Sequence, residues 1–375
     1  MNIADVKAFA LRLQDDHTEE PAYSIAAGER RAYKSRFHET MVVRIETDEG
    51  IVGYGEGQSP VSPRTTKAIV EDLCGPILLG ADPFDTGHLW HRMFSSMRER
   101  GHPTGFFIDA LAACDIALWD IMGKTTGRPV HKLLGGRYRD RIKLYAGCAG
   151  EDPSAVAAHA AKLIEQGYEG LKLSLRSPRT HILSVVSAVR ECVGSAIALM
   201  VDVHTVYSVP EAIHLGRGLE KLDVFWLEAP TVPEDIQGCA EICRALDLQV
   251  AAGEWSRTRF EMREAFERRA YDVVTPDIGR TGLSEGIRIA TLADTYNIPV
   301  SPHIGGGGIL AIAATIQFSA AIPGFLIMEH GHEVHAYRSQ IAHRAPRPDD
   351  GAFILDDNPG LGVEIDEDAL NRYAI

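Results

Sequence analysis

The stretch ALMVDVHTVY, residues 198–207, decides how the whole chain is interpreted. Residues 198–201 are apolar and indicate a buried strand, and the acid Asp202 follows them directly. A carboxylate at the end of a core strand is costly unless a neighbouring group neutralises it. The stretch therefore raises two questions: what neutralises Asp202, and why His204 follows on the same face of the strand.

Eight short apolar runs, of which this is one, are spaced about 23–28 residues apart from residue 140 onward. Amphipathic helical stretches separate them, and this alternation predicts an α/β fold with a (β/α)₈ (TIM-like) barrel. An open doubly wound sheet is the alternative, but it rarely needs eight such regular units. The runs are IKLYAG, LKLSL, IALMVD, VFWLEAP, QVAAGE, DVVTPD, IPVSPH and FLIMEH.

The chain outside this repeat has a different pattern. Residues 41–57 predict a β-hairpin, helical patterns follow near 64–75 and 83–99, and FFIDALAACDIALWDIMG predicts a buried helix. We predict three parts, with the active site at the strand carboxyl ends of the second. They are an α+β amino-terminal domain (1–130), the barrel domain (131–340) and a carboxyl-terminal segment that returns to the first domain (341–375).

The overall charge is negative, because 52 acidic residues face 38 basic ones and give −14. This balance argues against a nucleic-acid partner, which requires a basic face. No apolar run reaches membrane-spanning length and no basic-then-apolar leader opens the chain, so we expect no membrane partner. The six scattered cysteines are expected to be small buried residues, in keeping with a cytoplasmic location.

Three acids follow neighbouring predicted strands at equal intervals. Asp202, Glu228 and Glu254 are 26 residues apart (228 − 202 and 254 − 228), so their carboxylates should reach the same level of the barrel mouth. Three such anions repel one another, and an all-oxygen set suits one Mg²⁺ per active site. For each acid alone, the alternative is a helix cap or a pair with a nearby arginine.

Different residue types follow the other strands. The sixth, seventh and eighth runs end in Asp277, His303 and Glu329. The Asp277 carboxylate can hold the tautomer of His303 and raise its basicity, so His303 is predicted to be a catalytic base. The second run contains Lys172 and Ser174, which face the same interior because they are two residues apart.

These residues resemble those of the enolase superfamily, in its mandelate racemase-like and muconate lactonizing enzyme-like branch. The resemblance covers a capping domain, the helix IALWDIMGKTTGRPVHKLLGG, the barrel and the PGLG tail. It implies that the three equally spaced carboxylates bind magnesium and that Asp277 and His303 form the base dyad. It also implies that Glu329 hydrogen-bonds the enolate oxygen of the substrate.

Two departures from that family's sequence pattern reduce the number of reactions expected of this chain. Many relatives carry Lys-x-Lys at the end of the second strand and use the second lysine as a base, but here Lys172-Leu173-Ser174 ends in a serine. His303 is then the only base, which disfavours racemisation, and Lys172 remains to bind the substrate carboxylate. His204 stands where relatives often have asparagine, and dehydratases resembling the galactonate and mannonate enzymes use a histidine there as general acid. The alternative is a hydrogen-bonding spectator.

The resemblance therefore implies an Mg²⁺-dependent hydro-lyase that converts a small sugar acid into a 2-keto-3-deoxy acid. Lys172, Ser174, His204, Glu329 and Arg31 are predicted to contact the substrate. Arg31 belongs to a polar segment, about residues 15–40, that resembles the mobile loop of the capping domain. Relatives assemble as homo-oligomers, so we expect a homo-oligomer.

Two alternative functions remain open. One is an epimerase or cycloisomerase of a sugar acid or lactone, and the other is a catalytically silent metal-binding relative. His330, His332 and His335 also follow Glu329, but their spacing fits no standard zinc set. We therefore predict surface or substrate-contacting roles for these three histidines.

Overall fold

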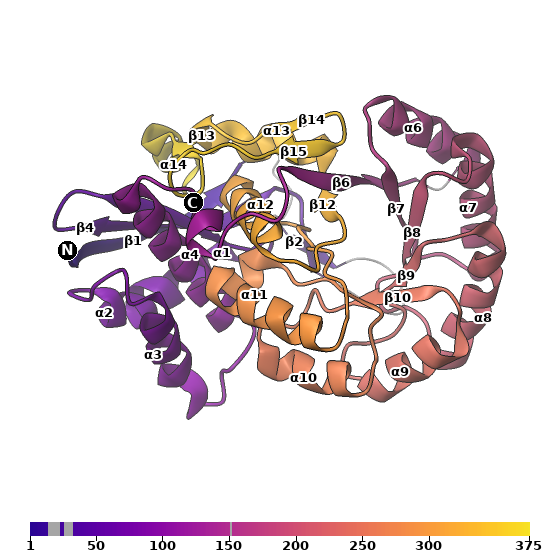
Figure 1. Cartoon of the computed structure of the whole chain (residues 1–375), viewed down its shortest axis with the longest axis horizontal. Coiled ribbons are helices and arrows are strands. Elements are labelled where there is room, and N and C mark those ends of the chain that lie inside the picture. The colour runs from indigo at the N-terminus through magenta and orange to yellow at the C-terminus, as the bar shows by residue number, and fades with distance from the viewer. Residues whose placement is uncertain (14–22, 26–32, 151) are drawn as a thin grey trace.

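The computed structural model describes residues 1–13, 23–25, 33–150 and 152–375. An antiparallel sheet with its helices lies at the left of Figure 1, and strands ringed by helices lie at the centre and right. The predicted fold class, a (β/α)₈-type barrel with an α+β amino-terminal domain, is confirmed. Within the described residues, no helix is long and apolar enough to span a lipid bilayer.

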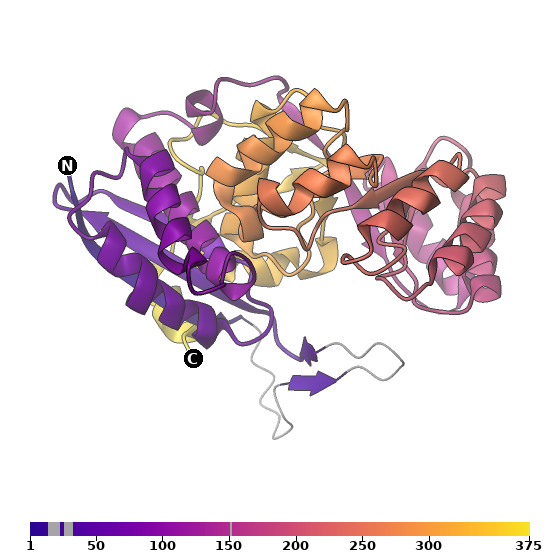
Figure 2. The same ribbon diagram turned by 90° about the horizontal axis from the view of Figure 1, so that it is seen from below.

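The amino-terminal sheet is an antiparallel meander whose strands are β1 (Ile3–Arg12), β4 (Glu39–Thr47) and β5 (Val52–Gly57). The predicted hairpin over residues 41–57 is confirmed, and its turn holds Gly50 at φ 78°, which glycine adopts at little cost. A separate hairpin stands apart from this sheet in Figure 2. Its strands are β2 (Tyr23–Ile25) and β3 (Tyr33–Ser35).

Helix α4 (Phe106–Thr126) packs unusually close to β5 because glycines alternate along that strand. A Cβ atom at Gly55 would lie 2.0 Å from the Ala113 carbonyl oxygen, and one at Gly53 would lie 2.3 Å from that of Ala117. A larger residue at either position would push the helix off the sheet. The other helices of this unit are α1 (Pro63–Ile69), the π-helix η1 (Val70–Cys74), α2 (Gly75–Leu78), α3 (Thr86–Arg98) and α5 (Val130–Leu133).

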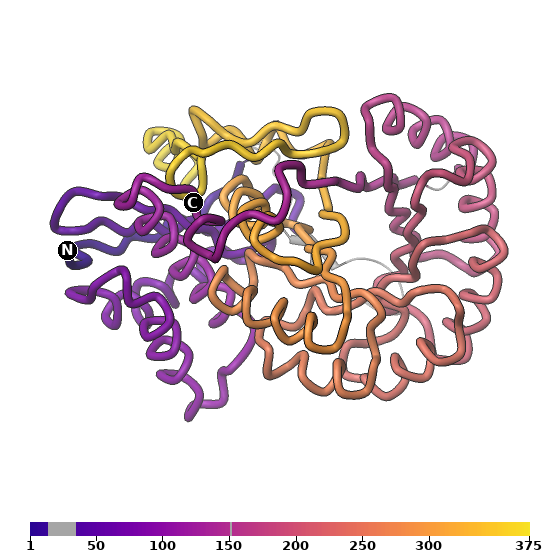
Figure 3. The backbone as a smooth tube through the Cα atoms, in the orientation of Figure 1, coloured from indigo at the N-terminus to yellow at the C-terminus, as the bar shows by residue number. Residues whose placement is uncertain are grey.

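The barrel wall starts with six parallel strands in chain order, and β12 (Met328–His330) pairs with β6 to close the ring. Figure 3 traces the outer helices in an arc from α6 to α10. The six strands are β6 (Arg141–Cys148), β7 (Gly170–Ser174), β8 (Ala198–Asp202), β9 (Trp226–Glu228), β10 (Gln249–Ala252) and β11 (Val273–Val274). The helices are α6 (Pro153–Glu165), α7 (Arg179–Val193), α8 (Val209–Leu219), η2 (Glu220–Leu222), α9 (Ile236–Ala245), α10 (Arg259–Glu267), α11 (Ile278–Thr295) and α12 (Ile309–Ala321).

The seventh position of the wall differs from the sequence prediction. The run IPVSPH forms no regular strand and makes only isolated parallel bridges, one of which joins Asp277 to His303. Pro299 and Pro302 explain the difference, because proline has no N–H to contribute to a strand ladder. The bridge nevertheless brings the two residues of the predicted dyad side by side.

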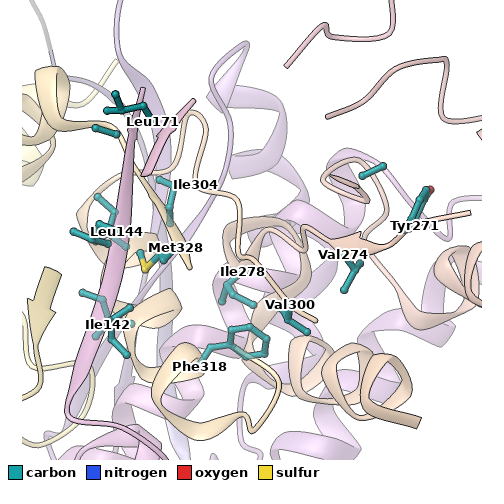
Figure 4. Close-up of a cluster of buried hydrophobic side chains, with 14 of the residues drawn as sticks. Ile142, Leu144, Leu171, Tyr271, Val274, Ile278, Val300, Ile304, Phe318 and Met328 are labelled. Carbon is teal, nitrogen blue, oxygen red and sulfur yellow. The ribbon is translucent and has the colours of Figure 1, made fainter. Parts of the chain in front are cut away.

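The core lies both outside and inside the ring of strands. Figure 4 shows part of the outer layer, where Leu144 and Met328 meet near the β6–β12 seam and Phe318 packs from α12. Inside the barrel, the rings of Tyr145 and Trp226 meet edge to face with centroids 5.7 Å apart. Side chains thus fill the interior, and chemistry is confined to the strand ends above them.

After β12 the chain returns to the amino-terminal sheet. The N–H of Ile375 donates to the Ala10 carbonyl at 2.9 Å, and Glu367 accepts hydrogen bonds from Arg44 and Tyr54. The elements of this last part are η3 (His332–Val334), α13 (His335–Arg338), η4 (Ser339–Ile341), β13 (Ala342–Arg344), β14 (Pro348–Asp349), β15 (Ala352–Ile354), β16 (Glu364–Ile365) and α14 (Glu367–Tyr373).

Glu56, in β5, connects the two units from a fully buried position. Its carboxylate accepts the backbone N–H groups of Gly308 (2.6 Å), Leu310 (3.0 Å) and Ala311 (3.1 Å) at the start of α12. An acid at this end satisfies amides that lack intrahelical partners and interacts favourably with the helix dipole. The amino-terminal sheet therefore supplies the N-terminal cap of a barrel helix.

Candidate active site

The three equally spaced acids occupy one side of the barrel mouth. Asp202 and Glu228 end β8 and β9 and are direct partners in the strand register. Glu254 lies two residues beyond the end of β10. All three are buried, with exposed fractions of 2%, 1% and 6%.

Lys172 lies among these carboxylates. Its Nζ is 3.1 Å from Glu228 Oε1, 3.8 Å from Asp202 Oδ2 and 2.8 Å from Glu329 Oε1. Burial by itself would lower the pKa of Lys172, but Glu228 and Glu329 outweigh burial and hold it well above its usual value. Lys172 is therefore a buried cation whose charge the acids maintain.

One lysine does not balance the negative charge of this side. Burial raises the pKa of Glu228 to about 7; Lys172 opposes the rise, and Asp202 and Glu254 add to it. A site that pushes its own carboxylate toward protonation favours an additional cation. The donor set, all carboxylate oxygen, fits a hard divalent ion such as Mg²⁺.

The carboxylates make other contacts in this structure. Among the described residues, the ligand atoms of Asp202, Glu228 and Glu254 do not all lie within 4.8 Å of one another. Lys172 holds Glu228, and Glu254 Oε2 is 3.2 Å from His303 Nε2. Sharing one ion therefore requires the acids to exchange these cationic partners for the metal.

His303 stands on the other side of the mouth. Its Nδ1 is 2.7 Å from Asp277 Oδ2, and its Nε2 is 3.6 Å from Glu329 Oε2. Burial lowers the pKa of His303, but Glu254, Glu329 and the hydrogen bond to Asp277 together raise it to about 9. A base must be neutral to accept a proton, and a cation bound by Glu254 would cancel the contribution of that carboxylate.

Glu329 is held as a hydrogen-bond acceptor. Its Oε2 receives the N–H groups of Ile304 (2.8 Å) and Gly305 (2.9 Å), and Lys172 contacts its other oxygen. Burial raises its pKa, yet Lys172 and His303 hold that pKa well below the usual value. The predicted contact between Glu329 and an enolate oxygen of the substrate stays a prediction.

His204 answers the question that the strand end raised. Its Nδ1 lies 2.8 Å from Asp202 Oδ1, without hydrogen-bond alignment, and its backbone N–H donates to the same oxygen at 2.9 Å. Asp202 is thus contacted by His204 and lies 3.8 Å from the cationic Lys172. His204 and Thr205 have positive φ (46° and 64°), a costly conformation that is found at functional sites.

The other predicted contacts lie around this point. The His204 side chain is 30% exposed, so a ligand in the mouth can reach it. Ser174 is exposed and pairs with Asp202 in the strand register. Arg31 lies outside the described residues, as does most of the segment 15–40.

Three residues that sequence reasoning missed support the base side. Gln58 Nε2 donates to Asp277 Oδ2 and to the Ile304 carbonyl, both at 2.8 Å. Arg280 donates to the Glu254 carbonyl at 2.7 Å and to Gln58, and buried Arg338 donates to the Gly305 carbonyl. Arg280 follows Asp277 by three residues and could have been found from that spacing. Gln58 and Arg338 come from distant elements that no local pattern connects.

Comparison with known families covers nearly the whole chain. A model described as "Enolase C-terminal domain-like" matches residues 155–369. A model described as "Mandelate racemase / muconate lactonizing enzyme, N-terminal domain" matches residues 24–135.

Curated proteins with similar sequences act on sugar acids or their lactones. D-galactarolactone cycloisomerase of Agrobacterium fabrum is 34% identical over 89% of this chain and 90% of that protein. D-galactonate dehydratase of Variovorax paradoxus is 33% identical over 88% of this chain and 90% of its own. Arabinonate dehydratase of Saccharolobus solfataricus is 29% identical over 99% of both.

Solved structures agree over the same length. An enolase superfamily member from Agrobacterium tumefaciens, 29% identical, has a TM-score of 0.93 over 99% of this chain and 98% of its own. The 3,6-anhydro-D-galactonate cycloisomerase from Zobellia galactanivorans, 28% identical, has a TM-score of 0.87 over 100% of both.

Proposed function

Because the chain belongs to the mandelate racemase and muconate lactonizing enzyme family of the enolase superfamily, we propose that it is an Mg²⁺-dependent acid-sugar dehydratase. Its curated relatives include acid-sugar dehydratases and a cycloisomerase, so enolase-type chemistry on acid sugars is the common ground. One observation carries the choice of dehydration. Asp277 and His303 form a single base dyad, and a second histidine, His204, lies beside Asp202 at the end of another barrel strand.

Asp202, Glu228 and Glu254 would hold the ion, as the pKa of Glu228, raised by burial and by the neighbouring carboxylates, supports. When bound, Mg²⁺ supplies Lewis-acid stabilisation of the negative charge that develops on the substrate carboxylate. Lys172 adds a fixed positive charge, positioned by Glu228 and Glu329 at 3.1 and 2.8 Å.

In the proposed reaction, His303 Nε2 accepts the C2 proton while Asp277 holds the opposite nitrogen and stabilises the imidazolium. His204 then donates a proton to the departing C3 hydroxyl, which leaves as water. The resulting enol tautomerises to a 2-keto-3-deoxy acid. Ser174 cannot serve as a base on the second face of C2, so the arrangement does not support racemisation.

The test separates proton abstraction from elimination. A panel of hexonates, pentonates and aldarates with saturating Mg²⁺ is first scored for 2-keto acids with semicarbazide. On the best substrate, His303→Asn should lose both C2 hydrogen exchange in D₂O and turnover. His204→Asn should retain exchange while dehydration falls by about 10²-fold or more. Each variant is the control for the other, and wild-type dehydration by His204→Asn would overturn the role of His204.

A second candidate function is the opening of a sugar lactone by elimination of its ring oxygen. The 34% identity to a D-galactarolactone cycloisomerase favours it. In that reaction the leaving group is a carboxylate, which is far less basic than hydroxide and departs without a proton. His204→Asn should then slow turnover of a lactone panel by less than about 10-fold, whereas His303→Asn should abolish it.

A further inference from the structure

A group of side chains outside the barrel mouth has the composition of a transition-metal site. His159 comes from α6, and His332 and Glu333 come from η3, 173 residues further on (332 − 159). Their ligand atoms all lie within 4.8 Å of one another, and they are the only such group of three or more in the described chain. We propose that these three residues bind a divalent transition-metal ion, foremost Zn²⁺.

The distances lie near those of a shared ion. His159 Nε2 is 3.9 Å from Glu333 Oε1. Two ligands about 2.0–2.1 Å from a tetrahedral zinc lie roughly 3.3 Å apart, so a shift of about 0.6 Å would complete this edge. The imidazole rings of His159 and His332 have centroids 5.5 Å apart and planes inclined by 49°, so they are tilted toward each other rather than stacked.

Cys148 orients His159 for this role. Its Sγ lies 3.5 Å from the Val156 carbonyl and 3.7 Å from His159 Nδ1. The Cys148 thiol donates to the Val156 carbonyl, and its sulfur can accept from His159 Nδ1–H. That arrangement leaves the lone pair of Nε2 free on the side of Glu333. Metal-binding histidines commonly have their second nitrogen engaged in this way.

The remaining two ligands suit a zinc-type ion. His332 contributes a half-buried imidazole, and a neutral imidazole is a common zinc ligand. Glu333 adds an exposed carboxylate, with 70% of its side chain accessible, which leaves room for a water at a fourth position. Two imidazoles and one carboxylate form a known zinc set, whereas Mg²⁺ prefers all-oxygen sites.

The site would join the two ends of the barrel. His159 belongs to the helix that follows β6, and His332 belongs to the turn that follows β12. These two strands pair with each other and close the ring. A metal bound here would fasten the first strand-helix unit to the last, beside the strand that carries Glu329. The spacing of His330, His332 and His335 could not indicate this metal site, because its other histidine, His159, comes from a helix far away in the sequence.

The experiment counts metal ions per chain. Full-length protein is stripped with EDTA, titrated with Zn²⁺ by calorimetry and with Co²⁺ by visible absorption, and compared with His159→Asn and His332→Asn. The wild type should bind one more ion per chain than either variant, because the carboxylates of the mouth are unchanged in all three. The extra Co²⁺ should show the strong visible bands of a four-coordinate imidazole site, which an all-oxygen site lacks.

Two further variants sharpen the result. Cys148→Ala removes only the group that orients His159, so it should weaken the extra ion by about 10-fold and leave the ion count unchanged. His214→Asn, at an exposed histidine on α8, is the matched control and should bind like the wild type. Equal ion counts in the wild type, His159→Asn and His332→Asn would overturn the proposal. An equal loss in His214→Asn would also overturn it, because the binding would then be nonspecific.

Discussion

The two sides of the barrel mouth are built in different ways. On the carboxylate side, Asp202 and Glu228 end regular strands and face each other across an unbroken parallel ladder. On the base side, Asp277 and His303 follow a two-residue strand and a proline-interrupted run, and only an isolated bridge joins them. There, side chains from other elements replace the ladder, with Gln58 holding Asp277 and Arg338 holding the loop above His303.

This difference has a physical lesson. A regular ladder places strand ends at one level without further support, so a residue interval is enough to predict which side chains meet. Where prolines remove ladder donors, long-range hydrogen bonds must set the geometry. The carboxylate side should therefore be sensitive to its own acids, and the base side to residues far away in the sequence.

The largest effects should come from breaking each side separately. Glu228→Gln should lower kcat by about 10³-fold or more and remove the rise in Tm that MgCl₂ produces, because a metal ligand is lost. Asp277→Asn should lower kcat by about 10²-fold or more but keep that rise, because it misorients only the base. Thermal unfolding with and without MgCl₂, beside steady-state kinetics, checks both. If Asp277→Asn also lost the rise in Tm with MgCl₂, the two sides of the mouth would not act independently, and this prediction would be wrong.

An intermediate effect should come from the support of the base side. Gln58→Leu removes the hydrogen bonds to Asp277 and to the Ile304 carbonyl and should lower kcat by about 10-fold, the worth of one or two buried hydrogen bonds. Its pH–rate profile should shift while the Mg²⁺-dependent rise in Tm stays at the wild-type value. Gln166→Leu, at an exposed glutamine after α6, is the control. If Gln58→Leu left both kcat and the profile unchanged, the dyad would not depend on this support.

The smallest effect should come from Ser174, which lies on the carboxylate side without being a ligand or a base. Ser174→Ala should change kcat by less than about 5-fold, because at most one hydrogen bond to substrate is lost. C2 exchange in D₂O should proceed as in the wild type. A loss as large as that of His303→Asn would show that the serine takes part in proton transfer.

The sequence predicted the barrel and the strand-end positions of Asp202 and Glu228, because apolar runs and their spacing are local properties. The prediction of a regular seventh strand was wrong, because the prolines within IPVSPH prevent a continuous strand ladder. His303 nevertheless lies beside Asp277, as predicted. Contacts between residues far apart in the chain were not predictable: nothing around Gln58 or His159 indicates the partner that the fold brings to it. The contact between Lys172 and Glu329 was not predictable for a related reason, because no spacing in the sequence connects the second strand to the eighth.

The carboxylate of Glu56 has a consequence for how this protein can be recombined. Because it caps α12 from another domain, the barrel removed from its partner sheet would leave three amide groups at that helix start without an acceptor. Heating should accordingly produce one calorimetric transition rather than two. A chimaera that takes its first domain from a homologue should require an acid in the same place, whatever else it exchanges.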